Sequence, residues 1–186
     1  HALIEAGLAL RAERGFKLHA GLNSSDDAFY GETPEFITML HNNKLLNDRT
    51  LVLIDAGAAK LFGPGLGNIV SNLKAAGYNP EQVDLVLITH LHGDHVNGLV
   101  TADGQMVFPK AQIWSAKADN EFWLSEEIAA KAPKDFQPFF KMSRDAAAPY
   151  LASGQWKTFT GNQELLAGIS SLDTHGHTPG HSSFVL

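Results

Sequence analysis

Short apolar runs alternate with polar, turn-like stretches over most of the chain, and their lengths predict a mixed α/β protein. The runs 36–40 and 50–54 are rich in β-branched residues and are separated by asparagines and an aspartate, as expected of adjacent strands. Apolar residues from Leu66 to Ala76 then recur at helical spacing, and Gly77 follows as a helix terminator. This part of the chain therefore predicts a strand, a loop and a helix in succession.

The run 83–89 is almost continuously apolar. That pattern is typical of a strand buried on both faces of a layered α/β fold with helices outside. Residues 1–35 predict no clear element. The remaining prediction is of short strands at 106–108, 113–114, 168–172 and 183–186, and of two helices within 117–152 that break near Pro133.

Composition limits the classes of protein to consider. With 186 residues and 44% hydrophobic content, the chain is long enough for one folded domain, expected over 1–186. It has no run of about 18 apolar residues and no block of basic residues, and its net charge is −6, so we expect neither membrane nor nucleic-acid partners. The absence of cysteine excludes disulfides, thiolate metal sites and a cysteine nucleophile.

Six of the nine histidines lie in two short windows, 89–95 and 175–181. In the first window, three imidazoles and a carboxylate follow the buried strand, a donor set that suits zinc, iron or manganese. Because alternate residues of an extended segment point the same way, His90 and His92 are expected to face one ion. Asp94 and His95 are expected to turn toward a second. We therefore predict two divalent metal ions, with zinc preferred.

The second window supplies a further candidate ligand. His177 is our choice as the third ligand of the first ion, because its Gly-His-Thr setting frees the backbone to bring the ring inward. His181 is expected to orient a ligand or the loop by a hydrogen bond, and an exchange of these two roles is the alternative. His175 is expected to face solvent.

Three motifs, 53–57, 90–95 and 176–181, occur in an order and spacing that resemble the metallo-β-lactamase superfamily of di-metal hydrolases. The resemblance implies a four-layer αβ/βα sandwich of the metallo-β-lactamase type. It implies a first metal held by His90, His92 and His177, a second metal to which Asp94 and His95 contribute, and support of the site by Asp55.

Within the superfamily, the chain is most similar to the methyl parathion hydrolase branch. The similarity is carried by 61–64, 122–125, 153–154 and 175–183 and covers roughly residues 36–186. That branch lines its substrate pocket with aromatic residues, and simple core packing is the alternative for each ring. The matching positions are Phe62 and Trp123, and less closely Phe139 or Phe140.

The superfamily completes its second metal site with a bridging Asp and a final His beyond the Gly-His-Thr motif. Only five residues follow His181, and none is Asp or His. Asp119 and the other remaining carboxylates lie in no motif-like surroundings, so none is chosen. We therefore expect the N-terminal part of the sandwich, truncated at Leu186, with a second copy of the chain or a complementary C-terminal chain as its partner.

The leading hypothesis is a metal-dependent hydrolase in which a metal-bound hydroxide attacks an ester, a lactone or a phosphotriester, since metals lower the pKa of water from about 15.7 to about 7. Asp94 is the candidate catalytic residue that orients this nucleophile. The alternatives are a glyoxalase II-like thioesterase, an iron-dependent redox protein and a non-catalytic metal-binding scaffold. The resemblance and the start at His1 favour a periplasmic or secreted protein over a cytoplasmic one.

Overall fold

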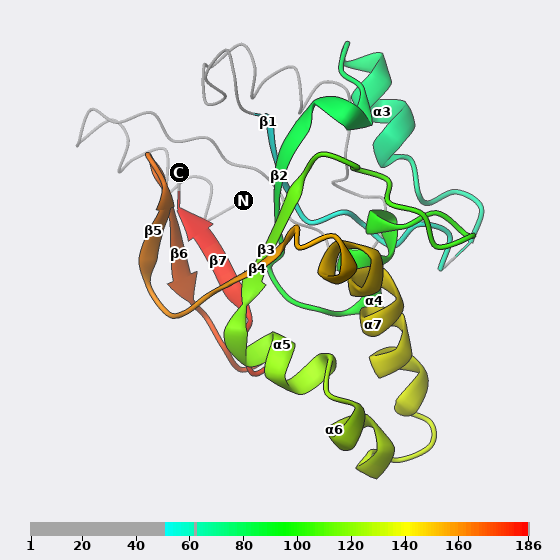
Figure 1. Ribbon diagram of the computed structural model, residues 1–186, viewed down its shortest axis with the longest axis vertical. Helices are drawn as coiled ribbons and strands as arrows, with labels where there is room; N and C mark the ends of the chain where they lie inside the picture. The colour runs from blue at the N-terminus through cyan, green and yellow to red at the C-terminus, as the bar shows by residue number, and fades with distance from the viewer. Residues whose placement is uncertain (1–50, 62, 186) are drawn as a thin grey trace, which may run out of the picture.

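The computed structural model describes residues 51–61 and 63–185, which form two β-sheets with helices packed along one side (Figure 1). The strands are β1 (Leu51–Ile54), β2 (Val83–Leu87), β3 (Gln112–Ala116), β4 (Trp156–Phe159), β5 (Gln163–Leu166), β6 (Ile169–Asp173) and β7 (Ser182–Val185). The α-helices are α3 (Ile69–Ala75), α4 (Gly93–Val96), α5 (Lys117–Trp123), α6 (Glu126–Lys131) and α7 (Gln137–Ala152). Short 3₁₀ turns lie at Pro80–Gln82 and Asn97–Leu99.

The larger sheet has four parallel strands in the order β1-β2-β3-β4. Its second strand is buried on both faces, as its continuous apolar pattern predicts. Leu85 and Leu87 belong to a core on one side of the sheet, and Val86 and Ile88 to a core on the other. The predicted α/β class is therefore confirmed, and β2 is the strand around which the layers are arranged.

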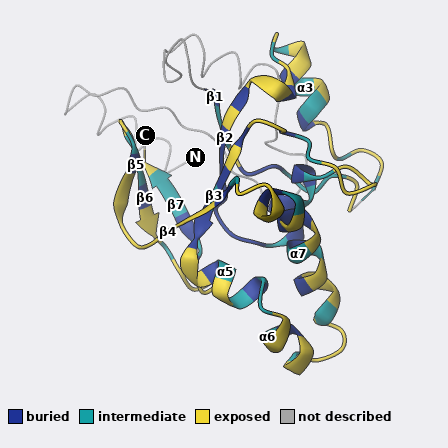
Figure 2. Cartoon of the chain, in the orientation of Figure 1, coloured by how far each residue is buried: buried dark blue, intermediate teal, exposed yellow. Residues whose placement is uncertain are grey.

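The smaller sheet is antiparallel, in the order β5-β6-β7. Phe184 from this sheet packs with Phe159 of the larger sheet, and the buried residues around them close the space between the two sheets. Figure 2 shows the buried residues gathered along the central sheet and on the helix faces turned toward it. In the described ranges, no helix is both long and apolar enough to cross a membrane.

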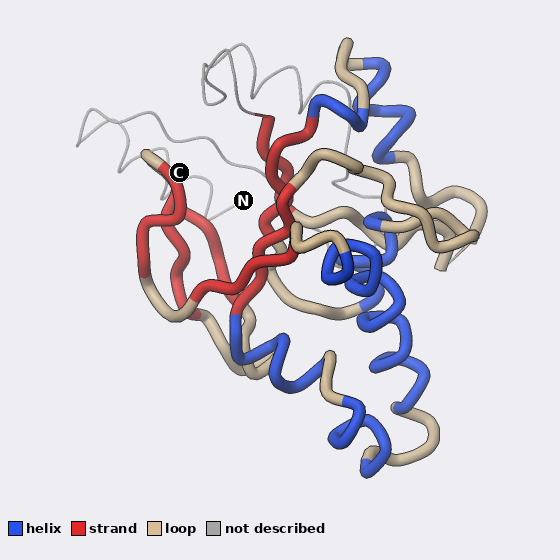
Figure 3. Tube along the Cα trace, viewed as in Figure 1, coloured by secondary structure: helices blue, strands red, loops and turns tan. Residues whose placement is uncertain are grey.

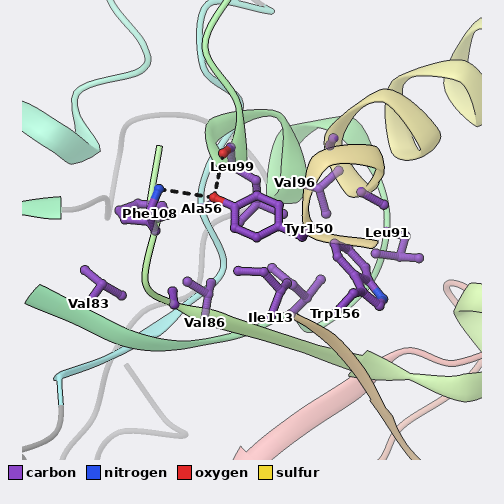
Figure 4. Packing of buried hydrophobic residues seen from close by; sticks show 14 of the residues in the cluster. Ala56, Val83, Val86, Leu91, Val96, Leu99, Phe108, Ile113, Tyr150 and Trp156 are labelled. Carbon is purple, nitrogen blue, oxygen red and sulfur yellow. Dashed lines mark hydrogen bonds between the residues drawn. The ribbon is translucent and has the colours of Figure 1, made fainter. Parts of the chain in front are cut away.

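The core on the helix side is organised around Tyr150 of α7, which is fully buried. Its hydroxyl donates to the carbonyl of Leu99 at 2.9 Å and accepts from the N–H of Phe108 at 3.1 Å (Figure 4). Burial raises the pKa of Tyr150 to about 12. The hydroxyl thus satisfies two backbone groups of the β2–β3 connection that would otherwise be buried without partners.

Two predicted elements differ from the structure, and two strands were not predicted. The segment 117–152 forms three separate helices rather than two (Figure 3), because Ser125 caps α6 by accepting from the N–H of Ile128 and so separates it from α5. The predicted strand at 106–108 is reduced to an isolated bridge between Val100 and Met106. Strands β4 and β5 were absent from the prediction.

Two further outcomes concern the ends of elements. Helix α3 begins at Ile69 rather than Leu66 and ends as predicted, with the N–H of Gly77 donating to Lys74. Helix α7 continues past Pro149 to its last turn. The strand predicted at 36–40 and the unassigned segment 1–35 lie outside the described residues.

Replacing Tyr150 with Phe should destabilise the protein by about 1–3 kcal/mol, because the carbonyl of Leu99 and the N–H of Phe108 both lose a buried partner. Chemical denaturation monitored by circular dichroism measures this change. Leu151→Ala, a half-exposed position on the same helix, is the control and should change stability by less than about 0.5 kcal/mol. Equal stability of the Tyr150→Phe variant and the parent protein would contradict the role of the hydroxyl.

Candidate metal centre

The histidine windows meet because of the sheet topology. Parallel strands place their carboxyl ends at one edge of a sheet, so Asp55 after β1 and the segment 89–95 after β2 lie together. The second window is the loop between β6 and β7 in the smaller sheet. The N–H of Ser182 donates to the carbonyl of Thr89 at 2.9 Å, which ties the base of this loop to the end of β2.

Three imidazoles from these two loops converge on one point. His90 Nε2 lies 3.1 Å from His92 Nδ1 and 3.1 Å from His177 Nε2, and one nitrogen from each of the three rings lies within 4.8 Å of the others. Two nitrogens bound to one tetrahedral zinc ion at about 2.0–2.1 Å would lie about 3.3 Å apart. The spacing and the donor type therefore fit a single divalent cation.

The backbone changes direction between the predicted ligand pairs. The chain is extended at His92, and α4 begins at Gly93, so Asp94 and His95 leave the line of the first two histidines. His95 Nε2 is buried, lies 3.3 Å from Asp94 Oδ2, and has no hydrogen-bond partner. A buried imidazole nitrogen whose nearest polar neighbour is a carboxylate oxygen forms with it a pair of donors that fits a second cation.

Asp55 contacts His95 directly and His90 through Thr89. Its backbone adopts a left-handed conformation, with φ of 59°, at the sharp turn after β1. Its carboxylate accepts from the N–H of Thr89 at 2.8 Å and bonds His95 Nδ1 at 2.8 Å. The Thr89 hydroxyl donates to Asp55 and lies 3.1 Å from His90 Nδ1. These contacts orient His90 and His95 so that the Nε2 atom of each is turned away from Asp55, and any supporting role of Asp55 would act through them.

The turn after β1 also requires a close backbone approach. The N–H of Ala56 donates to the carbonyl of His95, and the N–H of Gly98 donates to the carbonyl of Gly57. A Cβ atom at Gly98 would lie 1.8 Å from the carbonyl oxygen of Ala56. Only glycine fits there, so this contact sets how closely α4 approaches the end of β1.

Burial and neighbouring charges shift the pKa values of the clustered histidines in opposite directions. Burial, together with the nearby histidines, lowers the pKa of His90 to about 2, and burial also lowers the pKa of His92. Burial alone would lower the pKa of His95, but Asp55 and Asp94 raise it to about 9. Burial would likewise raise the pKa of Asp94, but His95 lowers it. At neutral pH, His90 and His92 are therefore neutral imidazoles, the form that binds metals.

The other two histidines of the second window lie apart from this cluster of nitrogens. His181 is partly buried, and its Nδ1 bonds the hydroxyl of Thr174 at 2.9 Å, while its ring centroid lies 5.0 Å from that of His90. His175 is exposed, as predicted, and pairs with Asp173 at 2.8 Å. His177 is also exposed, so the cluster opens to solvent on its side.

The aromatic candidates for a substrate pocket have different surroundings. Trp123 lies against His92 with ring centroids 4.9 Å apart, and it also packs on Phe140, which is buried. Phe139 is nearly half exposed. Phe62 lies outside the described residues. Of the three described rings, Trp123 is the one with a ring contact to a predicted ligand.

Sequence reasoning passed over Asp119, which is completely buried between the two histidine loops. Its carboxylate accepts from the N–H of Leu91 and from the N–H of Gly180, partners that lie 28 and 61 residues away. Its neighbours in sequence form no motif, and no local pattern could have identified it.

Comparisons with known proteins place this geometry in context. A family model described as the metallo-beta-lactamase superfamily matches residues 41–186. An N-acyl homoserine lactonase from a Bacillus species is 28% identical over 118 residues, and one from Bacillus cereus is 30% identical over the same length. These 118 residues are 63% of this chain and 38% of the lactonases, so the chain spans well under half the length of these curated relatives.

Solved structures agree. The hydrolase AbOPH of the beta lactamase superfamily is 44% identical with a TM-score of 0.67, and the match covers 74% of this chain and 48% of AbOPH. AidC, described as a dizinc quorum-quenching lactonase, is 20% identical with a TM-score of 0.64, over 82% of this chain and 58% of AidC. At that identity, the likeness to AidC concerns the fold alone.

The raised pKa of His95 predicts how the stability of the metal-free protein depends on pH. The stabilisation is fully present below pH 6.5, the pKa of His95 in the unfolded chain, and is lost as the pH rises through about 9. The difference in unfolding free energy between the parent protein and His95→Gln should therefore be larger at pH 6 than at pH 10, by about 3 kcal/mol.

Denaturant titrations in the presence of a chelator measure this difference. His175→Gln is the matched control, because its imidazole and its partner Asp173 are both exposed, and an exposed ion pair contributes little to stability. A stability difference for His95→Gln that stays constant from pH 6 to pH 10 would show that Asp55 and Asp94 do not hold a protonated His95.

Proposed function

The chain belongs to the metallo-beta-lactamase superfamily, and from this membership we propose that it is a metal-dependent hydrolase of lactones and carboxylic esters. One observation carries the proposal. The nitrogens of His90, His92 and His177 converge from two loops at the carboxyl edge of the sheet, with His177 exposed to an incoming substrate. A site of this kind, open on one side, is the arrangement that catalytic metal centres need.

We propose that these three histidines hold the first cation and that Asp94 and His95 contribute to a second, with zinc preferred. Imidazole nitrogens and carboxylate oxygens without any thiolate are ligands that zinc accepts, and iron and manganese share them. When bound, such cations lower the pKa of water enough to supply hydroxide near neutral pH, and they polarise a substrate oxygen. The protein contributes the positions of the ligands and the environment around them.

Asp94 is the proposed catalytic residue. Its side chain is partly exposed, its pKa is lowered by His95, and its Oδ2 is 3.3 Å from His95 Nε2. An ionised carboxylate at this position can accept a hydrogen bond from the attacking water and so orient it. Trp123, packed on His92, provides an apolar wall that excludes bulk water and contacts the apolar part of a substrate.

Lactones come first among the substrate classes because the curated relatives are N-acyl homoserine lactonases. Aryl esters share the same attack on a carbonyl carbon. Phosphotriesters form the second class, because the same cation chemistry acts on a phosphoryl oxygen. Two features support phosphotriesters as this second class. One is the resemblance to the methyl parathion hydrolase branch, which stays a prediction, and the other is the aromatic ring of Trp123 beside His92.

The test compares the zinc-loaded protein with a His92→Ala variant. Removing one of three ligands of the first cation should lower metal content and reduce turnover at least about 100-fold. His175→Ala removes an exposed histidine from the neighbouring loop and should keep full activity. Turnover is measured with an N-acyl homoserine lactone, an aryl ester, a phosphotriester and a glutathione thioester, alongside metal analysis by mass spectrometry.

Full activity of His92→Ala would overturn the metal role of the histidines. Preference for the thioester would favour a glyoxalase II-like enzyme. Stoichiometric iron with oxygen consumption would replace the hydrolase with an iron-dependent redox protein.

A further inference from the structure

Asp119 lies where two loops that are distant in sequence approach each other. Helix α5 follows β3 directly, so its first turn stands at the same carboxyl edge of the sheet as the histidines. Asp119 is in that first turn, and its side chain is fully buried. A buried carboxylate needs hydrogen bonds to offset its desolvation, and the described residues show where they come from.

Each oxygen of the carboxylate is bonded to a different histidine loop. Oδ2 accepts from the N–H of Leu91 at 2.9 Å, and Oδ1 accepts from the N–H of Gly180 at 2.6 Å. Leu91 stands between His90 and His92, and Gly180 stands three residues after His177. One side chain therefore joins the segment that supplies two candidate ligands to the segment that supplies the third.

The surroundings hold both partners in place. The hydroxyl of Ser143 in α7 donates to the carbonyl of Leu91 at 2.5 Å, so both polar groups of the Leu91 backbone are bonded. On the other loop, a Cβ atom at Gly180 would lie 2.5 Å from the backbone nitrogen of Asp119 and 3.0 Å from the Cβ of Ala116. The second loop can reach the carboxylate because residue 180 has no side chain.

We propose that Asp119 is a positioning residue that sets the distance between the two histidine loops and thereby the affinity of the metal centre. The hydrogen bond from Ser182 to Thr89 joins the two histidine loops where they meet the strands. Asp119 joins the same loops a second time, at positions close to the candidate ligands. It does not belong to the converging set of nitrogens, so its action is indirect. The inference rests on the proposed function only in requiring that the three histidines bind a metal ion.

The first experiment measures zinc affinity of Asp119→Asn by competition with a chromophoric chelator. The amide keeps the shape of the carboxylate but has one acceptor oxygen, so one of the two N–H groups must face an NH₂ group instead. Affinity should fall about 10- to 100-fold, the usual effect of removing a group that orients metal ligands. The cobalt-loaded variant should also show an altered ligand-field absorption spectrum, because the three nitrogens no longer keep their spacing.

The matched control is Asn120→Ala, at the next position of the same helix. Asn120 bonds Ser115 and Trp156 and so connects β3 with β4, without touching either histidine loop. The Asn120→Ala variant should have a lower melting temperature than the parent protein but the same zinc affinity and the same cobalt spectrum. This control separates loss of general stability from loss of loop alignment.

A double-mutant cycle with His177→Ala decides between positioning and a general structural role. If Asp119 acts by holding His177 against the other two histidines, then Asp119→Asn should weaken zinc binding by less than about 2-fold once His177 is removed, because coupled residues are not additive. The same factor in both backgrounds, or unchanged affinity of Asp119→Asn, overturns the proposal. If Asp119→Asn does not fold, Gly180→Ala enters the same cycle, because it displaces only the second loop.

The parent protein separates this inference from the proposed function. If the parent binds no zinc, cobalt or iron, the metal centre is wrong and the positioning role falls with it. If the parent binds metal and the cycle is additive, the metal centre stands and the role of Asp119 alone is wrong.

Discussion

The burial of β2 on both faces is the constraint on which the rest of the structure depends. Its apolar side chains alternate between the helix side and the side of the smaller sheet, so neither layer can be removed without exposing them to water. The helix layer and the smaller sheet therefore lie on opposite sides of β2, and both reach its carboxyl end. Thr89 and His90 stand at that end, and the backbone bond from Ser182 joins the smaller sheet to it.

The same constraint determines the electrostatics of the site. Because His90 follows the buried end of β2, its ring is buried and stays neutral, whereas His95 on the next turn is reached by Asp55 and Asp94, which raise its pKa to about 9. The rings of His90 and His92 are therefore neutral, whereas the carboxylates of Asp55 and Asp94 both lie beside His95. This separation follows from the layers of the fold rather than from any single contact.

The parts predictable from the sequence are those with strong local signals. The continuous apolar run of β2 and the clustered histidines could be recognised directly, because burial on both faces and metal-ligand chemistry leave dense patterns. Strands β4 and β5 could not, because Trp156–Phe159 has apolar residues only at its two ends and Gln163–Leu166 begins with two polar residues. Their strand conformation depends on pairing with β3 and β6.

Asp119 was missed for a related reason. Its role depends on the approach of two backbone N–H groups that are remote in sequence, and the residues next to Asp119 in the sequence give no sign of them.

The sequence also determined the aromatic assignments weakly. Trp123 and Phe140 pack on each other as core residues would, and only contact with His92 distinguishes Trp123. Residues that act through tertiary contacts become visible only when the fold is known.

The geometry of the histidine cluster argues against a purely structural role. A neutral imidazole nitrogen carries either one hydrogen or one lone pair in the ring plane, so it forms one good hydrogen bond. His90 Nε2 lies 3.1 Å from a nitrogen of His92 and equally close to one of His177, and it can satisfy only one of them. Whichever nitrogens carry hydrogens, at least two of the three are of the same kind, so hydrogen bonds alone cannot satisfy all three. A cation between the three nitrogens would accept all three lone pairs at once, so the spacing suits metal ligands better than hydrogen-bond partners.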